Sequence, residues 1–126
     1  MDRDIRNKLI ELARQKTTWS YKQLNQQLFL GFDFQLKDHH EKIGEILAKI
    51  SLHEHSRKRP LLSALIKHSS YTEKKKDRNF VKLCESIYGI GWEQLKADPA
   101  FEQERIKECI DFWKEDDKYH AHKNDY

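Results

Sequence analysis

The chain has 126 residues, with 24 Lys and Arg, 21 Asp and Glu, and a net charge of +3 at neutral pH. This length fits one domain, and no apolar run approaches the roughly 20 residues of a membrane-spanning helix. Leu, Ile, Val and Phe make up about 24% of the residues, above the level of roughly 20% that is typical of disordered chains. The N-terminus lacks the apolar stretch of a signal peptide, and two cysteines, Cys84 and Cys109, exclude a disulfide scaffold. We therefore expect a cytoplasmic domain without a membrane segment.

The N-terminal half is predicted to be helical, because apolar residues recur there at spacings of three and four. A first helix is expected over about residues 2–16. Ser20 is a typical N-cap for a short second helix that carries Tyr21. Asp38, followed three residues later by Glu41, is typical of a helix start and predicts a third, longer helix.

The third helix is expected to end at the basic segment 57–60. The apolar run 61–66 follows a proline and predicts the one convincing strand, and residues 67–78 form a polar, basic connection. Helix, short helix, third helix, strand and basic connection is the order of a winged helix-turn-helix. In that arrangement the third helix enters a DNA major groove, and the basic wing contacts phosphates.

The C-terminal part is predicted to add two helices. An apolar stripe that starts at Phe80 indicates one helix, which ends at the glycine-containing segment 89–91. Asp98 as N-cap and Pro99 at the first helical position indicate the other. The polar residues 116–126 are expected to fray. The side chains expected to pack in this extension are Phe80, Leu83, Ile87, Trp92, Phe101, Ile110 and Trp113.

The predicted fold is therefore mainly α, with a winged helix-turn-helix-like core, a short strand or hairpin, and two extra C-terminal helices. We expect a single domain over 1–126, made of the core 1–78, a helical extension 79–115 and a polar tail 116–126. No internal repeat or long linker divides the chain.

The modest net charge conceals two opposed segments. Residues 57–82 hold nine Lys and Arg against two acidic residues, a net of +7. Residues 93–126 hold six basic and ten acidic residues, a net of −4. A basic segment adds salt-sensitive affinity for phosphates, although a run of lysines is also typical of a solvated loop.

Short motifs in the first half resemble the winged helix-turn-helix of the DNA alkyltransferases and alkyltransferase-like proteins. The matching segments are Ser20-Tyr21-Lys22-Gln23-Leu24, then Lys42-Ile43-Gly44 with Ile46-Leu47, and Pro60-Leu61-Leu62. The similarity covers about residues 18–67. Three positions of this chain, Tyr21, Lys42 and Gly44, match functional positions of that family. The match implies that Tyr21 contacts the backbone or the bases of DNA and that Gly44 is a point of close approach.

Two positions depart from that family. Leu65 falls where the family has its acceptor cysteine, and no Pro-Cys-His-Arg segment is present, so transfer of an alkyl group to a thiolate is excluded. Glu41 falls where the family has the arginine that enters the DNA stack. Because a carboxylate repels phosphates, Glu41 argues against DNA binding in that mode.

A second resemblance spans most of the chain and is to uncharacterised small prokaryotic and phage proteins. These combine a helix-turn-helix segment with an R-P-x-L-S-A-L-[IV] strand, a basic or glycine-rich turn, and a helix that opens with an aromatic residue. Residues 59–66, Asn79-Phe80 and Phe112-Trp113 fit this pattern. The resemblance implies a fold and no particular activity.

The exposed side of the third helix is predicted to carry Lys42, Glu45, Lys49 and His53. The two lysines and the histidine suit phosphates or base edges. Glu41, Glu45 and Glu54 lie among them, which is typical of a mixed-charge helix stabilised by Glu–Lys pairs, and which also suits a protein partner.

Metal binding and nucleophilic catalysis are not favoured. The histidines occur in pairs without a CxxC or HExxH spacing, so we interpret them as surface residues: His39 and His40, His53 and His55, His120 and His122. Ser63 lies in an apolar run without a nucleophile elbow, and both cysteines lie on apolar helix faces. Arg59 suits a bidentate bond to phosphate or carboxylate, or a cap on the carbonyl groups that end the third helix.

The leading hypothesis is a non-enzymatic protein that binds nucleic acid, DNA in particular, and needs no cofactor or metal. The residues expected to contact the nucleic acid are Tyr21, Lys42, Lys49, Arg57, Lys58, Arg59, Lys74, Lys75 and Lys76. The rival hypothesis is a protein–protein adaptor or inhibitor of phage, mobile-element or defence type, with the acidic C-terminal face as its contact surface. A metal-dependent enzyme is the third alternative.

Overall fold

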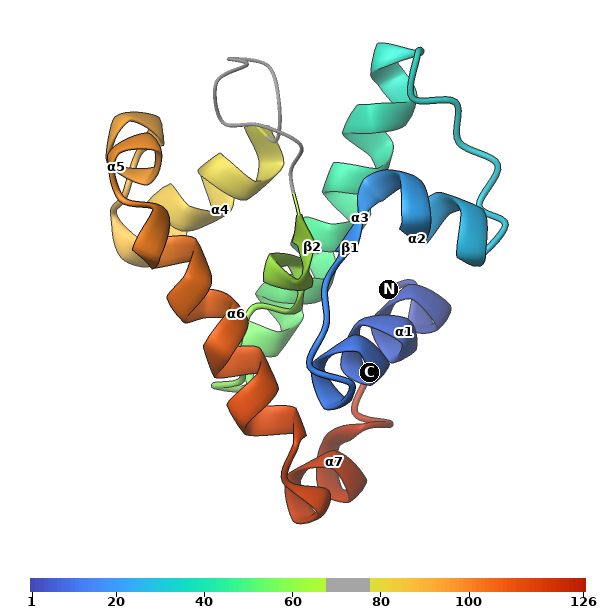
Figure 1. Ribbon diagram of the computed structural model, residues 1–126, viewed down its shortest axis with the longest axis vertical. Coiled ribbons are helices and arrows are strands. Elements are labelled where there is room, and N and C mark those ends of the chain that lie inside the picture. The colour runs from blue at the N-terminus through green and yellow to red at the C-terminus, as the bar shows by residue number, and fades with distance from the viewer. Residues whose placement is uncertain (68–77) are drawn as a thin grey trace.

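A computed structural model describes residues 1–67 and 78–126, and in these ranges the protein is mainly helical, as predicted. Figure 1 shows the arrangement. Within the described part, no helix is long and apolar enough to cross a membrane. The elements in chain order are α1 (Arg3–Arg14), β1 (Trp19–Ser20), α2 (Tyr21–Gln27), α3 (Lys37–Ser56), η1 (Leu62–Leu65), β2 (Ile66–Lys67), α4 (Arg78–Tyr88), α5 (Trp92–Ala97), α6 (Pro99–Trp113) and α7 (Asp116–His122).

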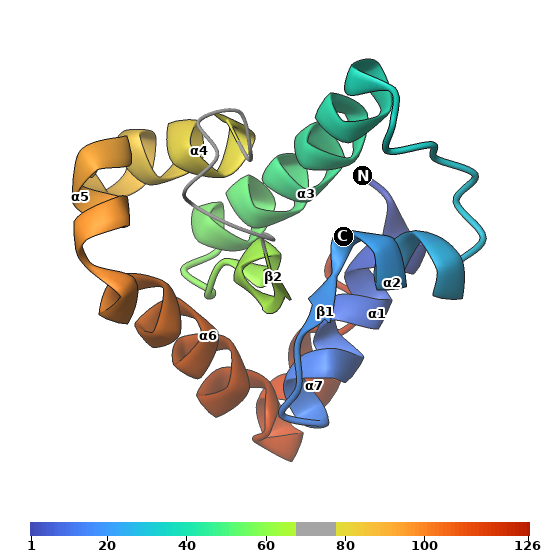
Figure 2. The ribbon, with the colours of Figure 1, turned by 45° about the horizontal axis from the view of Figure 1, so that its top comes forward.

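The core surrounds the 3₁₀-helix η1, which lies in the middle of the molecule with α1, α3 and α6 around it (Figure 2). Every residue from 61 to 66 is buried. The strand predicted over 61–66 is therefore wrong for most of its length, since residues 62–65 form the 3₁₀-helix and only Ile66 belongs to β2. A run that is apolar on all sides lacks the alternation of a strand, so its periodicity does not distinguish a strand from a buried helical turn.

The small sheet joins two segments that are far apart in the sequence. Trp19 pairs with Ile66 and Ser20 with Lys67, in parallel. The sequence indicated no strand at Trp19, where a break between helices was expected. The predicted wing falls on residues 68–77, which lie outside the described residues.

Three of the predicted helix starts are confirmed. The Asp2 side chain accepts a hydrogen bond from the Ile5 backbone N–H and caps α1. Ser20 and Gln23 form a capping box at the start of α2, each side chain bonded to the backbone N–H of the other residue. Asp98 caps α6, whose first residue is Pro99. Such caps satisfy backbone N–H groups that have no partner inside the helix.

The start of α3 differs from the prediction. The helix begins at Lys37, after Leu36, and Asp38 lies inside its first turn, where a negative charge complements the helix dipole. Farther along, Gly44 marks the point where α4 comes close. A Cβ atom at Gly44 would lie 2.7 Å from the Asn79 Nδ2 atom of α4. Within this chain, the close neighbour of Gly44 is therefore Asn79 of α4.

The C-terminal extension contains three helices in the described residues, where the sequence predicted two. Helices α4, α5 and α6 follow one another in an arc around η1 (Figure 2). A second apolar cluster holds them together and consists of Phe80, Cys84, Leu95 and Phe101. Of the side chains expected to pack here, Phe80, Leu83, Phe101 and Trp113 are buried, and Ile87 and Ile110 are half-buried.

The fraying expected for residues 116–126 does not occur. Residues 116–122 form α7, and the chain end returns to lie beside α1 (Figure 1). The hydroxyl group of Tyr126 donates a hydrogen bond of 3.0 Å to Asn7 Oδ1 in α1. The polar composition of this tail suggested fraying, but the contacts that hold the tail in place are themselves polar.

Candidate functional site

The outer face of α3 is one candidate surface. Lys42, Glu45, Lys49 and Leu52 are exposed at spacings of three and four, on the side of the helix opposite its buried residues Ile43, Leu47 and Ile50. Neither Lys42 nor Lys49 has an ion pair with a described residue. Two of the predicted contact residues are therefore available to a ligand.

Arg57 and Lys58 extend this surface at the end of α3, and both are exposed. Lys58 has a φ of +60°, and its N–H donates to the carbonyl group of His55. The next N–H, that of Arg59, donates to the carbonyl group of Glu54. This pattern is a Schellman motif, which usually has glycine at the left-handed position. It leaves Lys58 outside and turns the following residue into the protein.

Arg59 is thus buried, with 5% of its surface exposed, and lies in an ion cluster with Glu54 and Arg6. The carboxylate of Glu54 accepts two hydrogen bonds from Arg59, Nε to Oε1 and Nη2 to Oε2, both at 2.9 Å. It accepts two more from Arg6, at 3.1 and 3.3 Å. The bidentate bond to a carboxylate that was one interpretation of Arg59 is confirmed, and its partner belongs to this chain.

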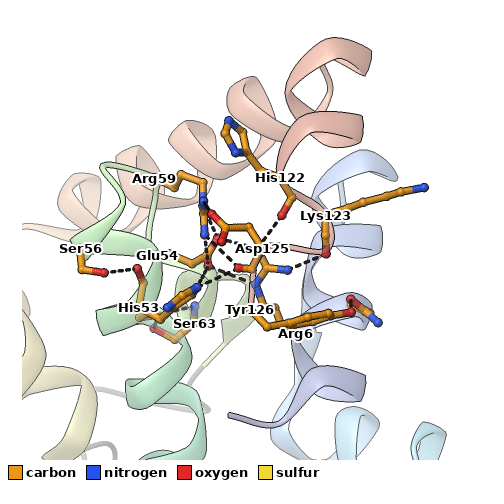
Figure 3. A network of polar contacts seen from close by, with 12 residues as sticks. Arg6, His53, Glu54, Ser56, Arg59, Ser63, His122, Lys123, Asp125 and Tyr126 are labelled. Atoms are coloured by element: carbon orange, nitrogen blue, oxygen red, sulfur yellow. Dashed lines mark hydrogen bonds and ion pairs between the residues drawn. The ribbon is translucent and has the colours of Figure 1, made fainter.

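The C-terminal segment closes the cluster (Figure 3). The guanidinium group of Arg6 donates to the backbone carbonyl groups of His122 and Lys123, at 3.0 and 2.7 Å. The Nη1 atom of Arg59 donates to Asp125 Oδ2 at 2.6 Å. The ring of Tyr126 lies against the guanidinium groups of Arg3 and Arg6. One fully buried carboxylate thus organises both arginines, which in turn fix the chain end.

Charge explains how the cluster tolerates burial. Burial is the largest single effect and lowers the pKa of Arg59, but the hydrogen bonds to Glu54 and Asp125 and the charges of these two carboxylates together raise the pKa overall. The same hydrogen bond from Arg59 lowers the pKa of Asp125, with smaller contributions from the charges of Arg59, Arg57 and His53. Buried charges are tolerated when they are paired and hydrogen-bonded in this way.

Three sequence-based expectations change as a result. Glu54, assigned to the exposed strip of the third helix, is 0% exposed. His53 is half-buried, and its Nε2 atom lies 2.8 Å from the carbonyl oxygen of Asp125. Tyr21, expected at a DNA surface, is 8% exposed and packs against the rings of Phe34 and His40. Arg59 and Tyr21 are thus inside the protein, and Lys74 to Lys76 lie outside the described residues.

Sequence reasoning missed Arg6, Glu54 and Asp125 as a unit. A signal was present, because Glu54 continues the inward stripe of Ile43, Leu47 and Ile50 at the next helical spacing. An acidic residue on an apolar stripe predicts a buried cation on a neighbouring helix. No sequence pattern indicated that the cation would be Arg6.

The histidines, the cysteines and Ser63 were considered as candidate metal ligands or nucleophiles, and the structure shows their surroundings. Among the described residues, no group of three His, Cys, Asp or Glu side chains is placed to hold a metal ion. Cys84 and Cys109 are buried, as expected, and burial raises the pKa of both thiols, that of Cys84 to about 12. Ser63 is buried too, and its hydroxyl oxygen accepts a hydrogen bond of 2.7 Å from Ser51 Oγ. These groups have the surroundings of packed residues.

An open groove of about 850 Å³ lies outside the buried cluster, between the end of α3 and helices α4, α6 and α7. Its lining includes the basic residues Lys58, Arg59 and Lys118 and the acidic residues Glu108 and Asp111.

Comparisons with protein-family models, with curated proteins and with solved structures gave no match to this chain. A function is therefore inferred from the fold and from two features of it. These are the outer face of α3 with its basic end, and the buried ion cluster.

Proposed function

We propose that this protein binds duplex DNA, without catalysis, through the outer face of α3 and the basic end of that helix. The contact residues are Lys42, Lys49, Arg57 and Lys58. Arg59 and Tyr21, which are buried, are not part of this surface. The observation that carries the proposal is a difference in pairing: these four cations are exposed and have no ion pair with a described residue.

At least five of the ten acidic side chains of residues 93–126 are, in contrast, paired within the chain. Asp111 pairs with Lys114, Asp116 with Arg14 and Asp125 with Arg59. Arg105 pairs with both Glu104 and Glu108. A carboxylate that is already paired within the chain is less available to attract a basic partner. This contrast favours the basic surface of α3 over the acidic face as the binding surface.

The spacing along α3 suits a major groove. With a rise of about 1.5 Å per residue, Lys42 and Lys49 lie about 10 Å apart along the helix axis, and Arg57 lies about 12 Å beyond. A major groove is about 12 Å wide and admits one α-helix. Glu45, between the lysines, is suited to accept a hydrogen bond from a cytosine amino group. The mixed strip is thus consistent with base contacts flanked by phosphate contacts.

The test is a fluorescence anisotropy titration of labelled duplex and single-stranded DNA over a range of salt concentrations. Four phosphate contacts predict that log K falls with log salt with a slope of about −3.6. The double variant Lys42→Ala, Lys49→Ala should reduce the slope to about −1.8. The matched control Lys16→Ala, Lys107→Ala removes two exposed lysines elsewhere and should leave it unchanged. Absence of binding to duplex DNA at low salt would refute the proposal.

A second candidate function, contact with a protein partner, is favoured by one feature. Phe29 is 91% exposed and has a φ of +52° at the end of α2. The loop that carries it is fixed, because the Asn25 amide bonds both the N–H and the carbonyl group of Phe32. A photo-crosslinking amino acid at position 29, with position 27 as control, tests this candidate. Crosslinks to a purified, defined partner at position 29 alone would support it, and equal crosslinking at both positions would reject it.

A further inference from the structure

The guanidinium group of Arg59 bonds two carboxylates that differ in exposure, Glu54 on its inner side and Asp125 on its outer side. Glu54 occupies the Nε and Nη2 atoms of the guanidinium group and is completely buried. The remaining nitrogen, Nη1, faces Asp125, whose side chain is 33% exposed. The inner bond is sealed by packing. The outer bond joins a buried cation to a carboxylate that solvent can reach.

The charges of the cluster require an anion at this outer position. Arg6 and Arg59 together carry two positive charges, and Glu54 carries one negative charge. An excess cation remains, and a buried cation without a counter-ion is costly. Asp125 supplies the missing charge, in a position that Arg57 and His53 also influence. Any group that displaces Asp125 has to be an anion with oxygen acceptors.

We propose that the Nη1 edge of Arg59, with Arg57 and Lys58 beside it, is an oxyanion-binding site for a phosphate group and that Asp125 occupies this site within the chain. The Asp125 side chain at this edge is 33% exposed, so solvent reaches the position. Arg59 also lines the open groove, together with Lys58 and Lys118 and with the acidic residues Glu108 and Asp111. Arginine binds phosphate and carboxylate with the same planar donor geometry, so the two ligands are exchangeable. The C-terminal segment thereby masks one phosphate contact at the basic end of α3.

Exchange at this position does not require the chain end to detach. The bonds from Arg6 to the carbonyl groups of His122 and Lys123, and from Tyr126 to Asn7, do not involve the Asp125 side chain. A phosphate can therefore replace one carboxylate while α7 stays in place. The source of the phosphate, a nucleic-acid backbone, rests on the proposed function. The oxyanion site itself does not.

The first experiment uses inorganic phosphate alone. Asp125→Ala opens the site, and Asp125→Asn removes the charge at nearly constant volume in case the alanine variant folds poorly. The matched control is Asp117→Ala, which removes the same charge from an exposed position in α7. In ¹⁵N-correlated NMR spectra, phosphate at constant ionic strength should shift the Nε–H signal of Arg59 in the Asp125 variants. It should leave this signal unshifted in the parent protein and in Asp117→Ala.

The second experiment repeats the duplex DNA titration with the same variants. One additional phosphate contact should make the salt slope of Asp125→Ala steeper by about 0.9 and raise its affinity about 3- to 10-fold. Asp117→Ala should match the parent protein.

The outcomes separate the two proposals. A phosphate-dependent shift of Arg59 in the Asp125 variants supports the oxyanion site even if no form of the protein binds DNA. In that case the phosphate belongs to a smaller ligand, and the proposed function fails by itself. An unshifted Arg59 signal in both Asp125 variants, or an equal response of Asp117→Ala, would overturn the inference whether or not the parent protein binds DNA.

Discussion

Replacing Glu54 by Gln changes the charge at the centre of the ion cluster and almost nothing else. The amide has the same shape as the carboxylate, but it carries no charge, and one of its two acceptor atoms becomes a donor. Of the four hydrogen bonds that Arg6 and Arg59 donate to Glu54, those directed at the amide nitrogen face another donor. Among the described residues, Arg59 then keeps the carboxylate of Asp125, whereas Arg6 keeps only its bonds to the carbonyl groups of His122 and Lys123.

The size of the effect follows from burial. Glu54 and Arg6 are 0% exposed, and Arg59 is 5% exposed, so water cannot replace the lost partner. Removing one member of a buried ion pair typically costs about 3–5 kcal/mol. A domain of this size has a free energy of unfolding of about 5–15 kcal/mol. We therefore expect Glu54→Gln to remove a large share of the stability and to lower Tm by more than about 10 °C.

Urea unfolding followed by tryptophan fluorescence measures this change, because Trp113 is fully buried in the same core. Glu45→Gln is the control, since Glu45 is exposed on the same helix, and its cost should stay within about 0.5 kcal/mol. Arg6→Met should cost much less in the Glu54→Gln protein than in the parent protein, because there it removes a cation that has already lost its partner. A cost of less than about 1 kcal/mol for Glu54→Gln would refute the reasoning.

Three further predictions concern the core and the chain end. Ser51→Ala should lower the free energy of unfolding by about 1–3 kcal/mol, and by more than Ser63→Ala, because Ser51 Oγ also accepts a hydrogen bond from the buried N–H of Ser63. Urea unfolding of both variants measures this difference, and equal costs would contradict it. In the folded protein Cys84 and Cys109 should react with a thiol reagent far more slowly than in denaturant, because burial raises their pKa values, and rapid labelling of either would contradict the structure. The hydrogen bond and charge of Arg14 lower the pKa of Asp116. The stabilisation that ionised Asp116 gives the folded protein is therefore present above the ordinary carboxyl pKa of about 3.9 and is lost as the pH falls through the lowered pKa. Urea unfolding from about pH 6 to about pH 2 should show a weaker pH dependence for Asp116→Asn than for the parent protein, and identical profiles would count against this assignment.

Helices α1, α2, α3, α4 and α6 were predictable from the sequence because their signals are local, whereas α5 and α7 were missed. Ser20 with Gln23, and Asp98 with Pro99, mark helix starts through bonds that span three residues or fewer. The apolar stripe of α3 predicted which of its faces is buried. These features depend on neighbours a few positions away, and a sequence shows such neighbours directly.

The remaining features depend on contacts between distant segments. The run 61–66 is apolar on every side, so its identity as a 3₁₀-helix is decided by the helices around it and by the bond from Ser51 to the Ser63 N–H. Arg59 looked like a surface cation because its neighbours in the sequence are basic. Only the return of the chain end to α1 and α3 shows that Arg6, Glu54 and Asp125 surround it.

The outer face of α3 and its last turn thus have different roles. Along its outer face, Lys42 and Lys49 keep their charges free, because no described acidic side chain reaches them. At its last turn, the Schellman motif directs Arg57 and Lys58 outward and Arg59 inward, within three consecutive residues. The inward residue secures the fold, and the outward residues continue the cationic surface. Asp125 bonds Arg59, and the charge of Arg57 also acts on it. The carboxylate that completes the buried cluster therefore also reduces the net positive charge at this end of the helix.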